Sequence, residues 1–348
     1  MSLGINISVP RKILLFLFEI FVKILWAFDK VTGLDLKYIG KTIIRAVFYA
    51  IPISFIVFLG YSISTGYLHK LYVAYFFPEI NIVHRNFSSY PYPVLTGSEP
   101  LPQTTALSLL AKDKKTNKTL VEKNVDMSLA PASTAKLMTA LVSMDIYDLE
   151  EELLVSNYCA GVEGTKAWLP AGERFKVKDL LKSMLIGSAG DSACVLATSK
   201  MSEEDFVSKM NEKVNSLGMT STRFSNPIGL DDTHENNYSN TLDLYKLAVY
   251  ATSIPEIKEI VGTKDFRFTN VEKDVNLLVR NTNRLLWEVP NSVGVKTGTT
   301  YEAGEVLIYE YDNGLKDIII VVMGSKNRFA DTKNILSWIG KNYSWKIL

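Results

Sequence analysis

The longest uninterrupted apolar stretch of the chain lies near its start. Residues 46–68, AVFYAIPISFIVFLGYSISTGYL, contain no charged side chain. As a helix, this segment is long enough to cross a hydrocarbon layer of about 30 Å. The basic residues crowded before it are Lys30, Lys37, Lys41 and Arg45. Since Lys70 stands nearly alone after it, the positive-inside bias predicts a cytoplasmic segment over residues 1–45 and everything beyond residue 70 outside the cell membrane.

A shorter apolar run precedes this span, over residues 13–28. It contains Glu19 and Lys23, which share one helical face. We expect this run to lie at the membrane interface, with a second span as the alternative, because its length is near the lower limit for crossing. A cleaved signal peptide fits less well, because the region before residues 46–68 is long and no small-residue cleavage site follows them.

Prolines interrupt the chain after the predicted span. They are Pro78, Pro91, Pro93, Pro100 and Pro102. Such a density breaks regular structure and favours extended backbone. We therefore expect residues 69–101 to form an extracytoplasmic stalk, and residues 102–348 to form one folded domain with its own core.

The folded domain is rich in strands at both ends and in helices between them. Residues 104–124 read as two strands joined by a polar turn, and residues 303–325 read as a hairpin turning at residues 312–314. Apolar residues recur at helical spacing in residues 133–147, 176–201, 202–218 and 328–343. This order predicts an α/β (α+β) fold, in which an antiparallel sheet assembled from both ends is flanked by helices and by an all-helical lobe.

Composition narrows the range of partners. The formal net charge is +1 with scattered charges, which gives no basic field for nucleic acid. The two cysteines, Cys159 and Cys194, have no further ligand at metal spacing. We expect both to be small core residues rather than a disulfide framework or a zinc site. No metal or cofactor is predicted.

One short motif carries candidate chemistry at the start of the first predicted helix. Ser133 and Lys136 lie three positions apart and therefore share a helical face. A lysine with an ordinary pKa of about 10.4 cannot accept a proton near neutrality, but burial and a neighbouring cation lower that pKa. Lys136 could then act as a general base toward the Ser133 hydroxyl. The alternative is an N-cap serine with a solvated lysine, which is the commoner meaning of an isolated S-x-x-K.

The histidines favour lysine as the base. Only His69, His84 and His234 occur, and the first two flank the predicted span or lie in the stalk. A Ser-His-Asp triad would require His234, which lies in the polar loop LDDTHENNYSN. We expect His234 to be a surface or loop-bracing residue.

Two further segments supply polar groups. Lys296, Thr297, Gly298 and Thr299 stand at the start of a predicted strand, where the glycine permits close approach of a ligand or a second backbone. Such an edge suits an extended peptide ending in a carboxylate, although an ordinary turn entering a strand has the same pattern. Ser188 falls in a small-residue break between two helical segments.

In this order, the three motifs resemble those of the penicillin-recognising serine enzymes, S-x-x-K, S-x-N and K-T-G. The surrounding blocks LAPASTAKLMTALVS, FSNPIGLDD and GVKTGTTYEAGEVLI are similar to the D-alanyl-D-alanine carboxypeptidase family of low-molecular-weight penicillin-binding proteins. The resemblance covers roughly residues 102–340. It implies a β-lactamase/transpeptidase-like fold and a serine-type carboxypeptidase that removes the terminal D-alanine of peptidoglycan stem peptides.

The resemblance also implies roles for single residues. Ser133 would attack the penultimate D-alanine carbonyl while Lys136 takes its proton, and β-lactams would acylate the same serine. The backbone amides of Ser133 and Thr299 would form the oxyanion hole. Ser188 would relay the proton to the leaving D-alanine. The substrate carboxylate would be drawn by Lys296 and bound by Thr297 and Arg328.

One departure from the family pattern stands in the second motif. In the family this motif ends in an asparagine that positions the substrate and the catalytic lysine. Here Gly190 stands in its place. A water, Asp191 or Ser192 could compensate. The alternative function is a catalytically weak or inactive homologue that binds stem peptides or a partner in wall synthesis. A β-lactamase is a third possibility, but the Glu-x-x-Leu-Asn loop of class A enzymes is absent from the sequence.

Overall fold

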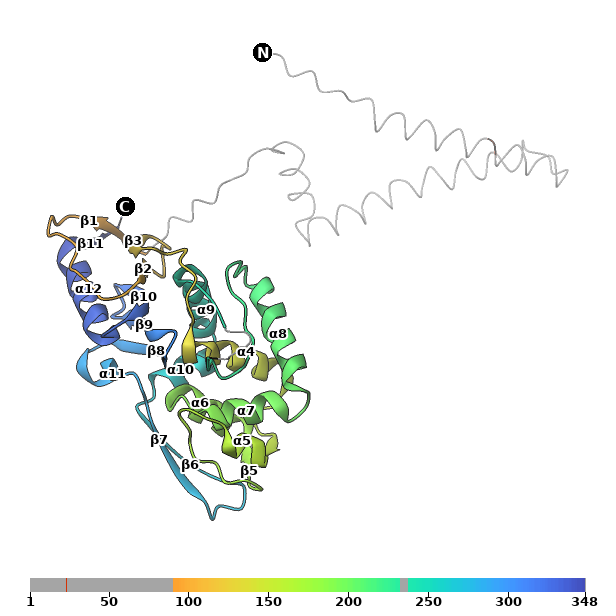
Figure 1. The fold of residues 1–348 in the computed structure, drawn as a ribbon. Coiled ribbons are helices and arrows are strands. Elements are labelled where there is room, and N and C mark those ends of the chain that lie inside the picture. Colours follow the sequence, from red (N-terminus) through yellow and green to blue (C-terminus); the bar gives the residue numbers. More distant parts are fainter. Residues whose placement is uncertain (1–22, 24–89, 232–236, 348) are drawn as a thin grey trace, which may run out of the picture. The chain divides into compact units, whose positions relative to one another are not determined.

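The computed structural model describes residue 23 and residues 90–231 and 237–347. Apart from Lys23, the predicted cytoplasmic segment with its apolar run over residues 13–28 lies outside these residues. The span over residues 46–68, most of the stalk and His234 lie outside them as well. No helix within the described residues is both long and apolar enough to cross a membrane. Apart from residue 23, the described residues belong to one compact unit, Phe87–Leu348, the second of two into which the chain divides. Every labelled helix and strand in Figure 1 belongs to the second unit.

A five-stranded antiparallel sheet, built from both ends of this unit, forms its centre, as predicted. The strand order is β3-β2-β10-β9-β8. The bounds are β2 (Ser108–Asp113), β3 (Thr119–Lys123), β8 (Ser292–Thr300), β9 (Gly304–Asp312) and β10 (Asp317–Ser325). Strand β10 is central and its sequence DIIIVVMGS is buried on both faces, which explains its unbroken apolar run. Strand β8 is an edge of the sheet.

Alternate residues of the central strands pack into two separate cores. On one face, Ile318, Ile320 and Val322 pack with Ile335 and Ile339 of α12. On the other face, residues such as Ile319 and Val321 join the larger core of the helical lobe. Figure 1 accordingly shows α12 on one side of the sheet and the remaining long helices on the other. The period-two alternation of the strands therefore creates both layers.

The helical lobe supplies most of the chain between β3 and β8. Its elements are η1 (Ala132–Ala135), α4 (Lys136–Ile146), α5 (Asn157–Gly161), α6 (Val177–Ile186), α7 (Gly190–Thr198), α8 (Glu203–Ser216), α9 (Thr241–Ser253) and α10 (Pro255–Gly262). The short α11 (Leu285–Glu288) and the long α12 (Arg328–Asn342) belong to the other side. These positions confirm the helices predicted from the apolar spacing. The small-residue break at residues 187–189 separates α6 from α7.

Three two-stranded ribbons complete the domain. They are β4 (Glu152–Leu154) with β5 (Arg174–Lys176), β6 (Asp265–Thr269) with β7 (Asn276–Arg280), and β1 (Tyr92–Leu95) with β11 (Tyr343–Lys346). The last ribbon differs from the predicted stalk, because residues 92–95 pair with the end of the chain. Proline is compatible with this strand because β1 pairs with β11 only. No second neighbouring strand requires the amide hydrogen that Pro93 lacks.

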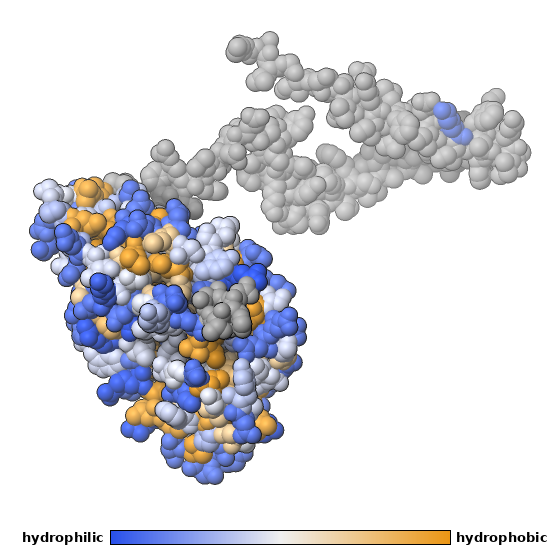
Figure 2. All heavy atoms as spheres, viewed as in Figure 1, coloured by the Kyte–Doolittle hydropathy of each residue, from blue (hydrophilic) through white to orange (hydrophobic). Residues whose placement is uncertain are grey.

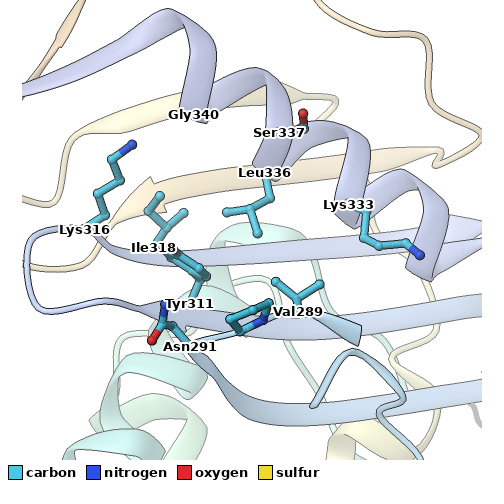
Figure 3. Close-up of a pocket in the computed structure, with 10 residues that line it drawn as sticks. Val289, Asn291, Tyr311, Lys316, Ile318, Lys333, Leu336, Ser337 and Gly340 are labelled. Carbon is cyan, nitrogen blue, oxygen red and sulfur yellow. The ribbon is translucent and has the colours of Figure 1, made fainter. Parts of the chain in front are cut away.

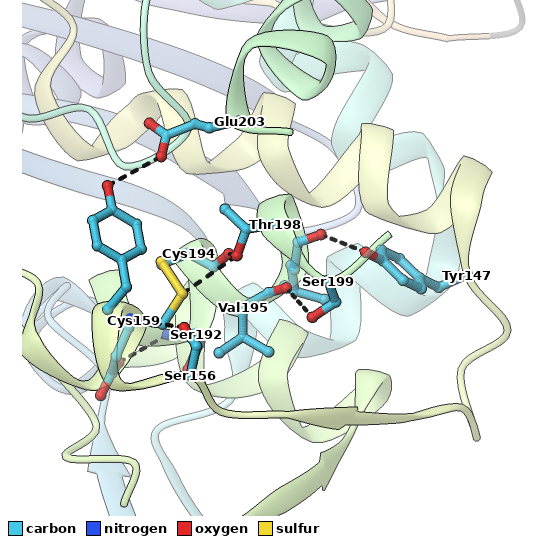
Figure 4. The surroundings of a disulfide bond; sticks show 12 residues. Tyr147, Ser156, Cys159, Ser192, Cys194, Val195, Thr198, Ser199 and Glu203 are labelled. Atoms are coloured by element: carbon cyan, nitrogen blue, oxygen red, sulfur yellow. Dashed lines mark hydrogen bonds between the residues drawn. A yellow bond between two sulfur atoms is a disulfide. The ribbon is translucent and has the colours of Figure 1, made fainter. Parts of the chain in front are cut away.

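The structure contradicts the expectation that the cysteines are unpaired. Cys159 of α5 and Cys194 of α7 form a disulfide, with their Cα atoms 5.3 Å apart (Figure 4). Both side chains are buried, so the expectation of core placement holds. The pairing could not be deduced from spacing, because two elements 35 residues apart are brought together only by the packing of α5 against α7.

The surface of this unit mixes polar and apolar residues. Figure 2 shows hydrophilic residues over much of the visible face, with hydrophobic residues gathered in small patches between them. This mixture agrees with the scattered charges and the formal net charge of +1.

An apolar pocket of about 430 Å³ lies between α12 and the outer face of the sheet (Figure 3). Its walls include Tyr311, Ile318 and Leu336, with Lys316 and Lys333 at its rim. None of its lining residues belongs to the three motifs, so the candidate chemistry lies elsewhere.

Candidate active site

The candidate nucleophile Ser133 lies in the 3-10 turn η1, directly before α4. Two glycines allow other segments to approach this turn. A Cβ on Gly298 would lie 2.9 Å from the Ser133 nitrogen, and a Cβ on Gly229 would lie 2.1 Å from the Ala132 carbonyl oxygen. Both distances are shorter than a side chain tolerates. Gly298 thus lets edge strand β8 run directly beside the candidate nucleophile.

Lys136 begins α4, and its side chain is almost completely buried at 1% exposure. Its Nζ lies 2.9 Å from Ser133 Oγ and donates to the Ile228 carbonyl at 2.6 Å. Burial lowers the pKa of Lys136 from 10.5 to about 7, although the negative charge of Asp191 opposes the shift. A substantial neutral fraction near neutrality is what a general base at this position requires.

Ser188 and Lys296 form a second pair in the same site. Lys296 Nζ donates to Ser188 Oγ at 2.9 Å and to the Thr297 carbonyl at 3.0 Å. The pKa of Lys296 is lowered well below its ordinary value by burial, and further by the charges of Lys136 and Arg328. Ser188 has a left-handed backbone with φ of 60°. The break between α6 and α7 therefore presents this hydroxyl to β8.

Strand β8 carries the remaining predicted residues. The Thr297 and Thr282 hydroxyls lie 2.5 Å apart, and Arg328 Nη1 donates to the Gly298 carbonyl at 2.7 Å and to Thr299 Oγ1. Burial lowers the pKa of Arg328. The structure thus brings all eight predicted residues to one place: Ser133, Lys136, Ser188, Lys296, Thr297, Gly298, Thr299 and Arg328.

Gly190 has a structural explanation. Its amide donates to the Thr165 carbonyl at 2.7 Å, and an added Cβ would lie 3.3 Å from both Ile228 Cγ2 and that carbonyl oxygen. A side chain at this position would therefore fit tightly, and its neighbours would have to shift by a few tenths of an ångström. The two suggested replacements for the motif asparagine are engaged elsewhere: Asp191 accepts from Ala167 N, and Ser192 bonds Ser183.

Sequence reasoning missed the Ile228 carbonyl as a partner of Lys136, the candidate base. Its position depends on Asn226, whose Oδ1 accepts from the amides of residues 228, 229 and 230 at 3.2, 2.7 and 3.2 Å. This turn aims the carbonyl of Ile228 at Lys136. The block FSNPIGLDD drew attention to the segment, but a main-chain acceptor carries no side-chain signature.

A second pocket, of about 530 Å³, adjoins this turn. Ile228 and Leu230 line it together with Tyr158 and three carboxylates, which are Glu163, Glu203 and Asp231. Within the part of the chain that the structure describes, no group of three or more His, Cys, Asp or Glu side chains could hold a metal ion. The reactive groups brought together are hydroxyls and amines, which suit acyl transfer through serine.

Comparison with known proteins agrees with this arrangement. Residues 95–327 match the family model of D-alanyl-D-alanine carboxypeptidase. The chain is 35% identical over 248 residues to D-alanyl-D-alanine carboxypeptidase DacF of Bacillus subtilis, covering 68% of this chain and 63% of that one. It is 30% identical over 253 residues to DacC of Escherichia coli, covering 68% and 62%. The match therefore spans less than two thirds of either curated relative.

Solved structures show the same fold. The DD-transpeptidase of Streptomyces superimposes with a TM-score of 0.65 at 27% identity, over 70% of this chain and 99% of that one. A D-alanyl-D-alanine carboxypeptidase of Mycobacterium tuberculosis gives 0.66 at 27% identity, over 71% and 94%. The family model covers more than half of the chain, and its match includes all the motif residues up to Thr299. The chain belongs to the D-alanyl-D-alanine carboxypeptidase family.

Proposed function

We propose that the chain is a serine-type carboxypeptidase that removes the terminal D-alanine from peptidoglycan stem peptides. The observation that carries the proposal is the contact between Lys136 and Ser133. Their Nζ and Oγ atoms are 2.9 Å apart, and burial lowers the pKa of the amine to about 7. A neutral amine at this distance can take the hydroxyl proton as the new bond forms.

Acylation uses these positions directly. Ser133 Oγ bonds to the carbonyl carbon of the penultimate D-alanine, and its proton passes to Lys136. The oxyanion is stabilised by the backbone amides of Ser133 and Thr299, each contributing about 3 kcal/mol in comparable sites. The C–N bond then breaks, and the departing amine receives a proton through Ser188. Water hydrolyses the resulting ester and restores the Ser133 hydroxyl.

The edge of β8 is the proposed peptide-binding surface. It is unpaired in the sheet, so an extended stem peptide can add to it as a further strand beside Ser133. The guanidinium of Arg328 makes this end of the strand electropositive, and Lys296 offers further N–H donors beside it. A terminal carboxylate would be held there, with the threonine hydroxyls of the strand as additional donors.

Release of D-alanine from a stem pentapeptide by the detergent-solubilised full chain tests the proposal. We expect release by the parent protein and none by a Ser133→Ala variant, while a Ser216→Ala variant on the exposed end of α8 retains activity. A parallel assay uses fluorescent penicillin, which should label the parent and the Ser216→Ala variant covalently. Failure of the parent in both assays, against a labelled control enzyme, would contradict the proposal.

The second candidate function is a non-catalytic binder of stem peptides, and Gly190 is the observation that favours it. In this case the parent binds a pentapeptide but releases no D-alanine. A β-lactamase is distinguished by the fate of its acyl-enzyme, because only that function predicts many turnovers of a chromogenic β-lactam per protein molecule.

We also propose that residues 46–68 anchor the protein in the cell membrane, with the peptidase domain on the extracytoplasmic side. The charge bias around this segment supports the orientation. The Cys159–Cys194 disulfide supports it independently, because disulfides persist in oxidising compartments. Protease added outside intact spheroplasts should degrade the domain. Protection of the domain until the membrane is permeabilised would contradict this orientation.

A further inference from the structure

Trp168 combines two properties that rarely occur together. Its side chain is 73% exposed, and its backbone is left-handed, with φ of 66°. A bulky residue is strained in this region of backbone space. Such strain persists only where the surroundings impose it, and it often marks a functional position.

The helix that follows the second motif imposes this conformation. Asp191 in the first turn of α7 is completely buried. Its Oδ1 accepts from Ala167 N at 3.0 Å, and its Oδ2 accepts from Leu169 N at 3.0 Å. One carboxylate thus holds the amides on both sides of Trp168. The backbone of Trp168 is thereby attached to the element that begins two residues after Ser188.

The indole is also supported from one side. Lys166 Nζ lies 4.7 Å from the centre of the ring and donates to the Ala160 carbonyl at 3.2 Å. This contact orders the ring while most of its surface stays open to solvent. An ordered, exposed aromatic ring is pre-organised for a flat apolar partner, because little entropy is lost when that partner binds.

We propose that Trp168 is a carbohydrate-binding residue that stacks on a sugar ring of the glycan to which the stem peptide is attached. This proposal rests on the proposed function and names a further part of the same substrate. The β8 edge beside Ser133 is the proposed site for the terminal residues of the peptide, whereas the sugar is attached at the other end of the stem. The loop that carries Trp168 packs on Gly190, the first residue of α7 and the last of the second motif, through the Thr165 and Glu163 carbonyls. A pyranose presents a flat C–H face, which matches the electron-rich face of an indole.

The test compares two substrates that differ only in the sugar. One is a free pentapeptide and the other is the same pentapeptide on a disaccharide. For Trp168→Ala, we expect the KM of the disaccharide substrate to rise about tenfold with kcat unchanged, and the KM of the free pentapeptide to stay constant. Trp168→Phe should restore most of the loss. An equal rise in KM for both substrates, or no change for either, would overturn the proposal.

Trp287→Ala is the matched control. Trp287 is 44% exposed and also has a lysine over its ring, Lys264 at 5.8 Å, but it lies in α11 rather than beside the second motif. Its loss should change neither KM. A binding measurement separates the inference from the proposed function, because it needs no catalysis. Isolated peptidoglycan should retain the Ser133→Ala variant about tenfold better than the Ser133→Ala/Trp168→Ala double variant. Equal retention of the two would overturn the sugar contact even if neither releases D-alanine.

Discussion

At the scale of single residues, Lys136 shows how burial converts a common side chain into a base. Its amine has a hydroxyl at 2.9 Å and a carbonyl at 2.6 Å, and no carboxylate lies within ion-pair distance among the described residues. The cost of desolvation exceeds the attraction of Asp191, so its pKa falls to about 7. The sequence indicated this chemistry through the S-x-x-K spacing together with the two further motifs and the family resemblance, whereas its electrostatic basis depends on residues distant in the chain.

The first prediction concerns pH. Because the neutral amine is the reactive form and its pKa is about 7, acylation should increase about tenfold per pH unit below 7 and level off above it. Stopped-flow labelling with a fluorescent penicillin between pH 5 and 9 measures this rate. The folded state must be verified over the same range by circular dichroism. A rate that does not change between pH 5 and 7 would contradict the assignment of Lys136 as the base.

The second prediction concerns Gly190. Restoring the family asparagine should not improve catalysis, because its Cβ would lie 3.3 Å from Ile228 Cγ2 and from the Thr165 carbonyl oxygen. We expect Gly190→Asn to lower the free energy of unfolding by about 1–3 kcal/mol through overpacking. Adding Ile228→Ala makes room for the asparagine, so the double variant should acylate faster than Gly190→Asn alone. The Ile228 carbonyl that holds Lys136 is kept, because it belongs to the main chain.

Penicillin labelling and urea unfolding measure these effects. Ile228→Ala alone is the control, because it removes packing without adding an amide. A single Gly190→Asn variant that acylates faster than the parent with unchanged stability would contradict the steric explanation.

At the scale of elements, the strand pair β9–β10 contains buried acids next to the turn that joins the two strands. Asp317 is 6% exposed, and its Oδ1 has no hydrogen-bond partner among the described residues. Burial, together with the charge of the nearby Glu310, raises the pKa of Asp317 from 3.8 to about 6. Such a group holds a proton in the folded state at pH values where the unfolded chain has already lost it.

The third prediction follows from that shift. The folded state binds the extra proton between pH 4 and 6, so stability falls as pH rises through this window, and the loss is complete above pH 6. Asp317→Asn should therefore raise the free energy of unfolding at pH 7.5 by about 1–3 kcal/mol and leave it unchanged below pH 4. Urea unfolding at both pH values measures the difference. The exposed Asp126→Asn is the control, and equal effects of the two substitutions would contradict the prediction.

At the scale of the whole molecule, the disulfide joins two segments of the helical lobe that are 35 residues apart. Such a bond mainly restricts the unfolded chain, and a loop of this length corresponds to about 3–4 kcal/mol. The fourth prediction is therefore that Cys159→Ala/Cys194→Ala lowers the free energy of unfolding by about that amount. Reductant should destabilise the parent similarly and leave the variant unchanged. Equal sensitivity of both proteins to reductant would contradict it.

Much of the domain could be predicted from local patterns. The turn before β3, the hairpin at residues 312–314 and the helices α8 and α12 each arise from periodicity and turn residues within one short segment, and the structure places them accordingly. The boundary with the stalk could not be placed in this way. Residues 92–95 become a strand because they pair with residues 343–346, and nothing in a proline-rich segment specifies so distant a partner.

The sequence by itself determined the motif residues, their order and the elements that carry them, because helical and strand periods act over a few residues. Only the tertiary structure decided three things: the pairing of Cys159 with Cys194, the Ile228 carbonyl on Lys136, and the tight space beside Gly190. Each depends on a contact between segments far apart in the chain. Such contacts are selected by the packing of the complete core, which no short stretch of sequence encodes.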